Sequence, residues 1–197
     1  MKTYKELKKK VVGHETTLAE AQAMVIASRA KGVICPCCGQ DCRVDPVRFN
    51  CQVALCLSWM VRRFEHNGGR WFNPQEEVPR RILRSRKWPK LAHWGLAEMQ
   101  EDHKTGGKVR GSWRPTEDGI AVAHRQKSVP TTVYTFDRHV LGFSLNRVYI
   151  DDGLGPYFDI NEILRAEIPM DILIKRGEQM EKAAKKAKAA EKNKRRC

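Results

Sequence analysis

Residues 50–69 read NCQVALCLSWMVRRFEHNGG and contain the clearest helical pattern of the chain. Their apolar side chains recur at steps of three and four residues, at Val53, Cys56, Leu57, Met60, Val61 and Phe64. This spacing places them on one face of an α-helix. Asn50 is a favourable N-cap, and Gly68-Gly69 ends the pattern. The stretch therefore predicts a long amphipathic helix that packs against a core.

Further helices are predicted on both sides of this stretch. Upstream, Thr17-Leu18-Ala19-Glu20 has the spacing of a capping box, and the Ala-rich run that follows ends at Gly32. Downstream, the patterns predict two short helices, a hairpin with a polar tip and one more helix, at residues 76–84, 85–95, 96–99 with 112–114, and 116–123. This order of elements is typical of a winged helix-turn-helix domain.

The remaining C-terminal residues predict a small β patch and a polar tail. Alternating apolar residues indicate strands at 132–136, 140–143 and 147–150, and Asp159 begins a further helix. From about Pro169 onward Glu, Lys and Ala dominate, which predicts a solvated helix or a disordered tail. We expect an α+β fold with four segments: an N-terminal helix and cysteine knuckle (1–49), a winged helix domain (50–127), a small β-rich extension with a short helix (128–168) and a basic tail (169–197).

Two segments resemble the MarR-like winged helix proteins. Lys90-Leu-Ala-His-Trp-Gly-Leu-Ala-Glu98 is similar to the end of their recognition helix and their first wing strand. Trp113-Arg-Pro-Thr-Glu-Asp-Gly-Ile120 is similar to their second wing strand and the start of the next helix. The resemblance covers roughly residues 51–125 and implies DNA binding as the usual role. Together with Cys-Pro-Cys-Cys-Gly-Gln at 35–40 and Val129-Pro130, it extends to small phage and prophage proteins of largely unassigned function, which favours a phage regulator of transcription.

The chain is strongly basic. Its 37 Lys and Arg residues against 23 Asp and Glu residues give a formal net charge of +14. Residues 171–197 contribute ten basic and four acidic side chains, or +6, so the other +8 lies elsewhere. Such a surface attracts polyanions, and nucleic acid is the first partner to expect. No stretch approaches the ~20 apolar residues of a membrane span, and residues 1–10 lack the apolar part of a signal peptide, so we expect a cytoplasmic protein without a membrane partner.

Six of the seven cysteines fall between Cys35 and Cys56. In a reducing compartment they are expected to be thiols or metal ligands rather than disulfides. Cys35 and Cys38 form a Cys-x-x-Cys turn that ends in Gly39, and with Cys42 and Cys51 they make a candidate structural zinc site. In the alternative, the knuckle forms without metal, and Cys51 and Cys56 are buried thiols.

Nine basic and three acidic residues lie between Arg62 and Lys90, a net charge of +6. If Leu91 and Trp94 face inward in the predicted helix 85–95, its basic side chains remain for a DNA groove. The candidates for the groove are Arg86, Lys87, Lys90 and His93. The candidates for the flanking phosphates are Arg80, Arg81 and Arg84, with Lys104, Lys108 and Arg110 in the wing.

We therefore expect a non-enzymatic protein that binds duplex DNA through the winged helix. Two alternatives remain, a module that docks a host defence or transcription protein, and an RNA-binding or nucleic-acid-processing protein. Trp88, Trp94 and Trp113 are expected in the core, although tryptophans also stack on unpaired bases. Asp151-Asp152 is expected to cap or solvate a turn, although paired carboxylates also occur in metal-dependent nucleases.

Overall fold

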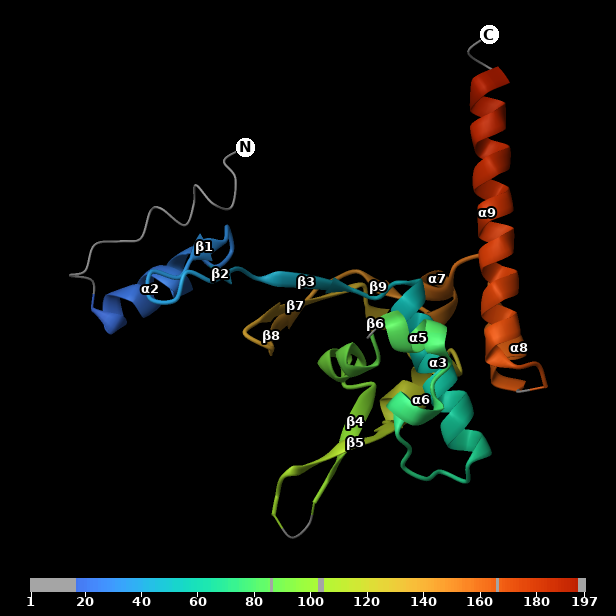
Figure 1. Ribbon diagram of the computed structural model, residues 1–197, viewed down its shortest axis with the longest axis horizontal. Coiled ribbons are helices and arrows are strands. Elements are labelled where there is room, and N and C mark those ends of the chain that lie inside the picture. The colour runs from blue at the N-terminus through green and yellow to red at the C-terminus, as the bar shows by residue number, and fades with distance from the viewer. Residues whose placement is uncertain (1–16, 86, 103–104, 166, 195–197) are drawn as a thin grey trace. The chain divides into compact units, whose positions relative to one another are not determined.

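A computed structural model describes residues 17–85, 87–102, 105–165 and 167–194 (Figure 1). The fold is α+β, as the sequence predicts. Two compact units are present, one formed by residues 17–47 with Thr132–Ser144 and the other by Arg48–Thr131 with residues 145–194. The units do not follow the order of the chain, because strands from residues 132–143 pair with a strand near the N-terminal side.

The first unit combines one helix with two small sheets. Its elements are α2 (Leu18–Ser28), β1 (Val33–Ile34), β2 (Asp41–Cys42), β3 (Asp45–Arg48, which reaches into the second unit), β7 (Thr132–Phe136) and β8 (His139–Phe143). The capping box of α2 is confirmed, since Thr17 Oγ1 accepts from the Glu20 N–H at 3.3 Å and Glu20 Oε2 accepts from the Thr17 N–H at 2.8 Å. β1 pairs antiparallel with β2, and β3, β7 and β8 form a three-stranded sheet.

A two-residue turn joins β7 to β8. Asp137 and Arg138 occupy it with φ angles of 46° and 66°, and the strands pair directly on either side, Phe136 opposite His139. Two successive positive φ angles define a type I′ turn, whose twist matches that of the strands. Neither residue favours this backbone region as glycine does, so the hairpin carries strain at its tip.

We predict that Arg138→Gly stabilises this hairpin by about 0.5–1 kcal/mol, because glycine adopts the required φ without a steric penalty. Amide hydrogen exchange in β7 and β8 should slow accordingly. Arg138→Lys, which keeps the Cβ, should leave the exchange rates unchanged. Faster exchange in the glycine variant would contradict the assignment of strain to this turn.

The second unit is built around α3 (Cys51–His66). Asn50 is its N-cap, as predicted, with Oδ1 accepting from the Val53 N–H at 3.3 Å. All nine residues from Val53 to Val61 are buried, so this part of the helix is covered on every side rather than on one face. α3 is therefore the central helix of the unit.

The elements that carry the predicted site pack against α3 or against one another. They are α4 (Pro74–Glu77), α5 (Arg80–Ser85), the 3₁₀ helix η1 (Trp88–Trp94), β4 (Ala97–Glu101), β5 (Lys108–Pro115) and α6 (Glu117–Ala123). β4 and β5 form the predicted hairpin, with Met99 opposite Trp113, and it extends away from α3 (Figure 1). Thr116 caps α6, the helix predicted at 116–123, since its Oγ1 accepts from the Gly119 N–H at 3.1 Å.

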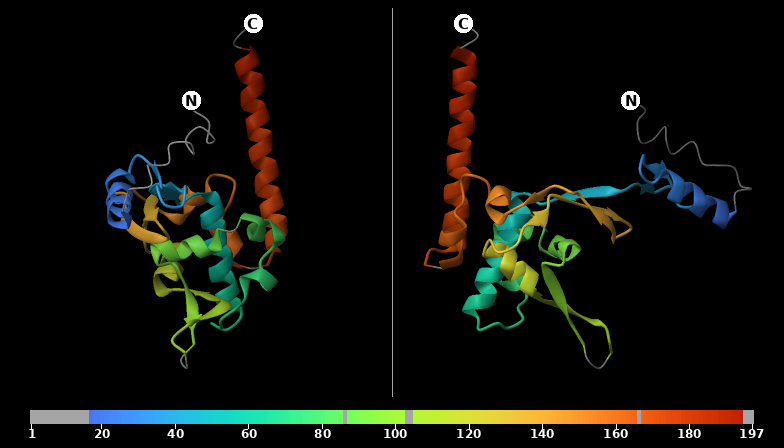
Figure 2. Two further views of the ribbon diagram at one scale, coloured as in Figure 1. Left: turned by 60° about the vertical axis from the view of Figure 1, so that its left-hand side comes forward. Right: turned by 180° about the vertical axis from the view of Figure 1, so that it is seen from behind.

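The last elements of this unit are β6 (Val129–Pro130), β9 (Arg147–Val148), α7 (Ile150–Leu154), α8 (Ile160–Arg165) and α9 (Met170–Lys194). The first turns of α9 belong to the core, because Met170, Leu173 and Ile174 are buried. A Cβ on Gly177 would lie 2.4 Å from Phe158 Cζ, so the helix and this ring touch closely. The C-terminal part of α9 extends away from the other elements of the second unit (Figure 2). The predicted basic tail is thus a helix with an anchored base.

Candidate nucleic-acid interface and cysteine cluster

The basic segment after α3 forms two short helices separated by a proline. Val78 ends α4 in an extended conformation, with φ −71° and ψ 134°, and Pro79 follows it. A residue before proline is disfavoured in helical geometry, which explains why the predicted helix 76–84 divides into α4 and α5. In α5, Ile82 is buried while Arg80, Arg81 and Arg84 are exposed. Arg80 and Arg84 are four residues apart and share one face of the helix.

The predicted recognition helix at 85–95 is corrected by the structure. Residues 88–94 form the 3₁₀ helix η1, which is narrower than an α-helix and brings side chains three residues apart into line. It ends at Gly95, which has a φ of 69°, as the sequence predicts. Leu91 and Trp94 do face inward, and Trp94 Nε1–H donates to the Pro130 carbonyl at 2.9 Å. The segment therefore presents its cations from a tighter and shorter helix than expected.

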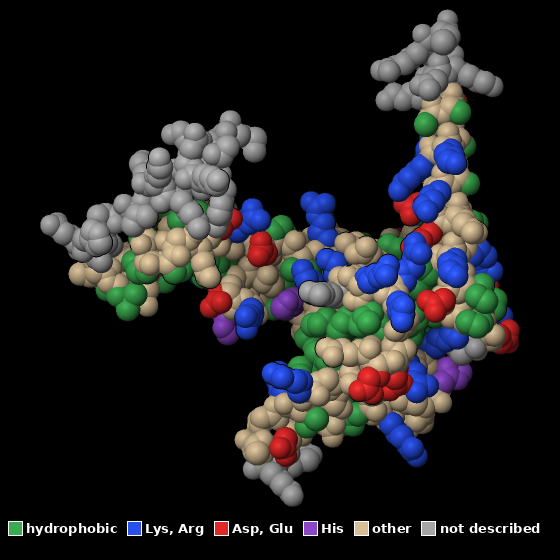
Figure 3. Space-filling view, in the orientation of Figure 1, with side chains coloured by type: hydrophobic (Ala, Val, Ile, Leu, Met, Phe, Trp, Pro, Cys, Tyr) green, Lys and Arg blue, Asp and Glu red, His purple; other side chains and the backbone are tan. Residues whose placement is uncertain are grey.

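Four cations of this segment have no described acidic partner. Arg81 forms an ion pair with Glu178 of α9. In contrast, Arg80, Arg84, Lys87 and Lys90 form no ion pair with any acidic side chain in the described part of the chain. We call these four residues the cationic face. Lys and Arg side chains gather over α5 and the neighbouring part of α9 (Figure 3).

His93 differs from the cations around it. Its ring is half-buried, and burial followed by the positive charge of Lys90 lowers the pKa of His93. The ring is thus neutral at pH 7 and offers a hydrogen-bonding group rather than a charge.

The β4–β5 hairpin carries the other predicted contacts. Lys108 and Arg110 are exposed. In the strand register of the hairpin, Lys108 lies opposite Glu101. Arg86 and Lys104 lie outside the described residues. The sequence did not indicate Trp71, which precedes α4. Its half-buried ring lies under the Arg114 guanidinium, with 4.4 Å from Cζ to the ring centroid, and lines a hollow of about 600 Å³ with Met99. Only the return of the chain beside β5, through a Phe72–Trp113 bridge, places it there.

The other aromatic and acidic candidates have structural roles. Trp88, Trp94 and Trp113 are buried, which confirms them as core residues. Asp151 and Asp152 lie in the first helical turn of α7, not in a loop between elements. Asp151 accepts two hydrogen bonds from Arg125, at 2.7 and 2.9 Å, and Asp152 accepts from the Tyr149 N–H at 3.0 Å. The two carboxylates thus bind different partners and do not face one common site.

The predicted cysteine knuckle is a tight hairpin between β1 and β2. The Cys35 N–H donates to the Gln40 carbonyl at 2.7 Å, and the Gly39 N–H donates to the Cys35 carbonyl at 2.9 Å. Gly39 has a φ of 70°, a conformation that favours glycine. Val33 pairs with Cys42 at the base of the hairpin. The turn therefore folds Cys42 back toward Cys35.

The thiols of this hairpin differ in acidity. The backbone N–H groups of Cys38 and then of Cys37 hydrogen-bond to the Cys35 sulfur, and this lowers the pKa of Cys35. Desolvation and the negative charge of the Cys35 thiolate raise the pKa of both Cys37 and Cys42. Cys35 is therefore a more acidic thiol than an ordinary cysteine, whereas Cys37 and Cys42 are less acidic.

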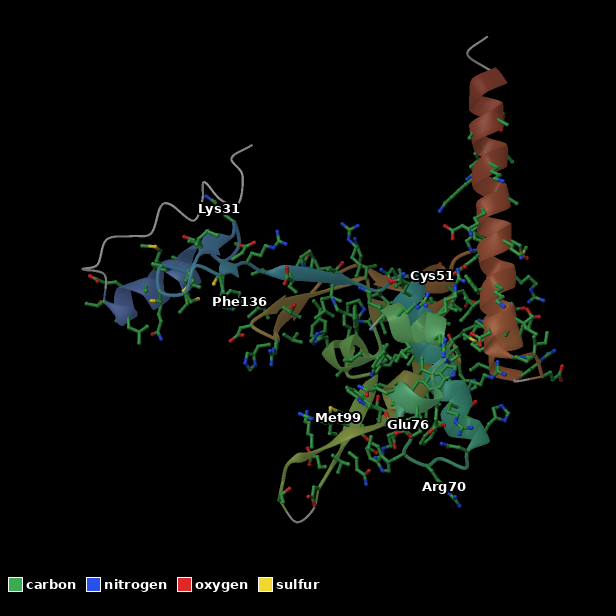
Figure 4. All side chains as sticks on the ribbon, viewed as in Figure 1. Lys31, Cys51, Arg70, Glu76, Met99 and Phe136 are labelled. Atoms are coloured by element: carbon green, nitrogen blue, oxygen red, sulfur yellow. The ribbon has the colours of Figure 1, made fainter. Side chains whose placement is uncertain are left out.

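The predicted zinc ligands divide between the two units. Cys35, Cys38 and Cys42 belong to the first unit, whereas Cys51 starts α3 in the second (Figure 4). Burial, followed by the charge of Glu181, raises the pKa of Cys51 to about 11, and burial raises that of Cys56 to about 12. Among the described residues, no group of three or more His, Cys, Asp or Glu side chains is arranged to hold a metal ion.

Within residues 17–194, apart from the gaps stated above, no helix has the length and apolar character needed to cross a membrane. No protein-family model, no curated protein and no solved structure matches this chain.

Proposed function

We propose that this protein is a non-enzymatic nucleic-acid-binding protein and that the cationic face contacts the phosphates of duplex DNA. The observation that carries the proposal is the absence of any described acidic partner for Arg80, Arg84, Lys87 and Lys90. A group of cations without acidic partners keeps its positive charge, and such a surface attracts a polyanion. Binding releases the counterions that are condensed on the DNA, which supplies the free energy.

The β4–β5 hairpin supports a second contact to the same duplex. It belongs to the same unit as the cationic face and extends from it with Lys108 and Arg110 exposed. The order α3, α5, η1, β4, β5, α6 is also the order of a winged helix-turn-helix domain, which is our proposal for this part of the fold. Because η1 is a 3₁₀ helix, we assign the cationic face to phosphate contacts and leave base contacts to His93.

We predict that the double variant Arg80→Ala/Arg84→Ala binds duplex DNA more weakly and with a salt slope shallower by about two units, because each phosphate contact contributes about one unit. Fluorescence anisotropy with a labelled duplex at several salt concentrations measures both quantities. The matched control is Arg63→Ala/Lys127→Ala, which removes the same charge from two residues already paired with Glu77 and Asp118. The control should keep the parental salt slope.

Two results would count against the proposal. If both double variants lower the affinity and the slope equally, net charge rather than the cationic face governs binding. If the folded parent binds no nucleic acid at low salt, the surface serves a protein partner instead. Competition of the duplex with single-stranded DNA and with RNA decides between the classes of nucleic acid, and preferential displacement by RNA would replace duplex DNA in the proposal.

A further inference from the structure

The first unit has a very small apolar core. Of its described residues only Ala21, Val47 and Val133 are buried apolar side chains, and Thr135 is the buried polar one. Several large apolar side chains remain in contact with water, among them Leu18 with 66% of its surface exposed, Ile26 with 58% and Phe143 with 51%. Burial of apolar surface is the main stabilising contribution in a folded unit. A unit with so few buried residues needs another source of stability.

The same unit holds four cysteines within eight residues. Cys35, Cys37, Cys38 and Cys42 all lie on the β1–β2 hairpin, and the pairing of Val33 with Cys42 closes it. Three of them, Cys35, Cys37 and Cys42, line a hollow of about 610 Å³ together with residues of α2. A metal ion bound by these cysteines would therefore cross-link the hairpin at a point beside α2.

The donor chemistry fits a thiophilic metal ion. Thiolates bind zinc in closed tetrahedral sites, whereas calcium and magnesium require oxygen ligands. The turn from Cys35 to Gly39, closed by a 2.9 Å bond from the Gly39 N–H to the Cys35 carbonyl, keeps these sulfur-bearing residues within one hairpin. The thiols do not yet converge on one point, so binding requires them to rotate about χ1.

We propose that Cys35, Cys38 and Cys42 bind one Zn²⁺, that Cys37 completes the tetrahedron, and that this ion holds the first unit folded. Cys37 thus replaces Cys51 in the ligand set expected from the sequence. Each thiol loses its proton when its sulfur binds, and the buffer accepts these protons. The site is independent of nucleic-acid binding, since the cationic face belongs to the second unit.

The test uses the full chain, purified under reducing conditions without chelator, with Zn²⁺ and Co²⁺ as probes. We expect about one zinc ion per chain, and a Co²⁺ spectrum with the strong thiolate charge-transfer and tetrahedral ligand-field bands of a four-sulfur site. Cys38→Ser should lower the zinc affinity roughly 100-fold, because it removes one of four ligands. Cys51→Ser is the matched control and should leave both the affinity and the spectrum unchanged.

Amide hydrogen exchange then tests the link to folding. Removal of zinc by a chelator should accelerate exchange in α2 and in the β1–β2 hairpin while α3 keeps its protection. Equal protection of α2 with and without zinc would overturn this link. The metal site itself is overturned by a chain that binds no zinc, by an unchanged zinc affinity in Cys38→Ser, or by a lowered zinc affinity in Cys51→Ser. A Co²⁺ spectrum that Cys37→Ser leaves unchanged would remove Cys37 as the fourth ligand.

Discussion

Replacement of Gly119 by alanine is expected to destabilise the second unit by about 3 kcal/mol. Gly119 is buried in α6, and a Cβ at this position would lie 2.1 Å from the backbone oxygen of Leu96. That carbonyl cannot move freely, because it accepts a hydrogen bond from the Thr116 N–H at 3.1 Å. Alanine therefore forces α6 and the segment before β4 apart, and the Thr116 cap is lost with them.

Urea denaturation followed by circular dichroism measures this loss as a lower midpoint at unchanged slope. Gly142→Ala is the control, since no atom lies within 4 Å of a Cβ at that position in β8. Its unfolding midpoint should equal that of the parent. A Gly119→Ala protein as stable as Gly142→Ala would show that α6 does not sit against Leu96 as described.

Truncation of Trp94 to alanine is expected to cost about 3–5 kcal/mol, the range for a large aromatic side chain removed from a core. Trp94 is 9% exposed, and its ring packs edge-on against Phe49, with 5.7 Å between the ring centroids. Its indole N–H also satisfies the Pro130 carbonyl at 2.9 Å. The variant thus loses both packing and a hydrogen bond, and its thermal unfolding midpoint falls.

Trp94→Phe separates the two contributions. It keeps an aromatic ring but removes the N–H, so it should cost roughly 1–3 kcal/mol for the unpaired carbonyl and the lost volume. The DNA affinity of the folded Trp94→Phe protein should equal that of the parent, because the ring faces the core. A folded protein with greatly weakened DNA binding would instead place Trp94 in the interface.

Local features of this fold were predictable from the sequence because their causes lie within a few residues. Thr17, Asn50 and Thr116 cap their helices through N–H groups three residues ahead. The β1–β2 knuckle depends on a turn that closes within eight residues and on a positive φ at Gly39. Capping and turn formation need no distant partner, so the residue types alone indicate them.

Other features needed contacts between distant residues. Trp88–Trp94 has a spacing that suits an α-helix and a 3₁₀ helix alike, and a bond from Trp94 to Pro130, 36 residues away, accompanies the tighter form. Trp71 reaches Arg114 only because its neighbour Phe72 bridges to Trp113. Such packing depends on the whole unit and leaves no periodic signal in either segment.

The residues of the candidate sites also fall into those predictable from local sequence and those that depend on distant contacts. Residue type and short spacing were enough to predict the cluster of cations after α3, the thiols at 35–42 and the capped helices. Long-range contacts pair Arg81 with Glu178, 97 residues away, whereas Arg80 and Arg84 have no ion-pair partner among the described residues. The same contacts place Cys51 in a different unit from Cys35. The physical reason is that charge pairing and burial act through space, so the availability of a side chain depends on which distant residues the fold brings beside it.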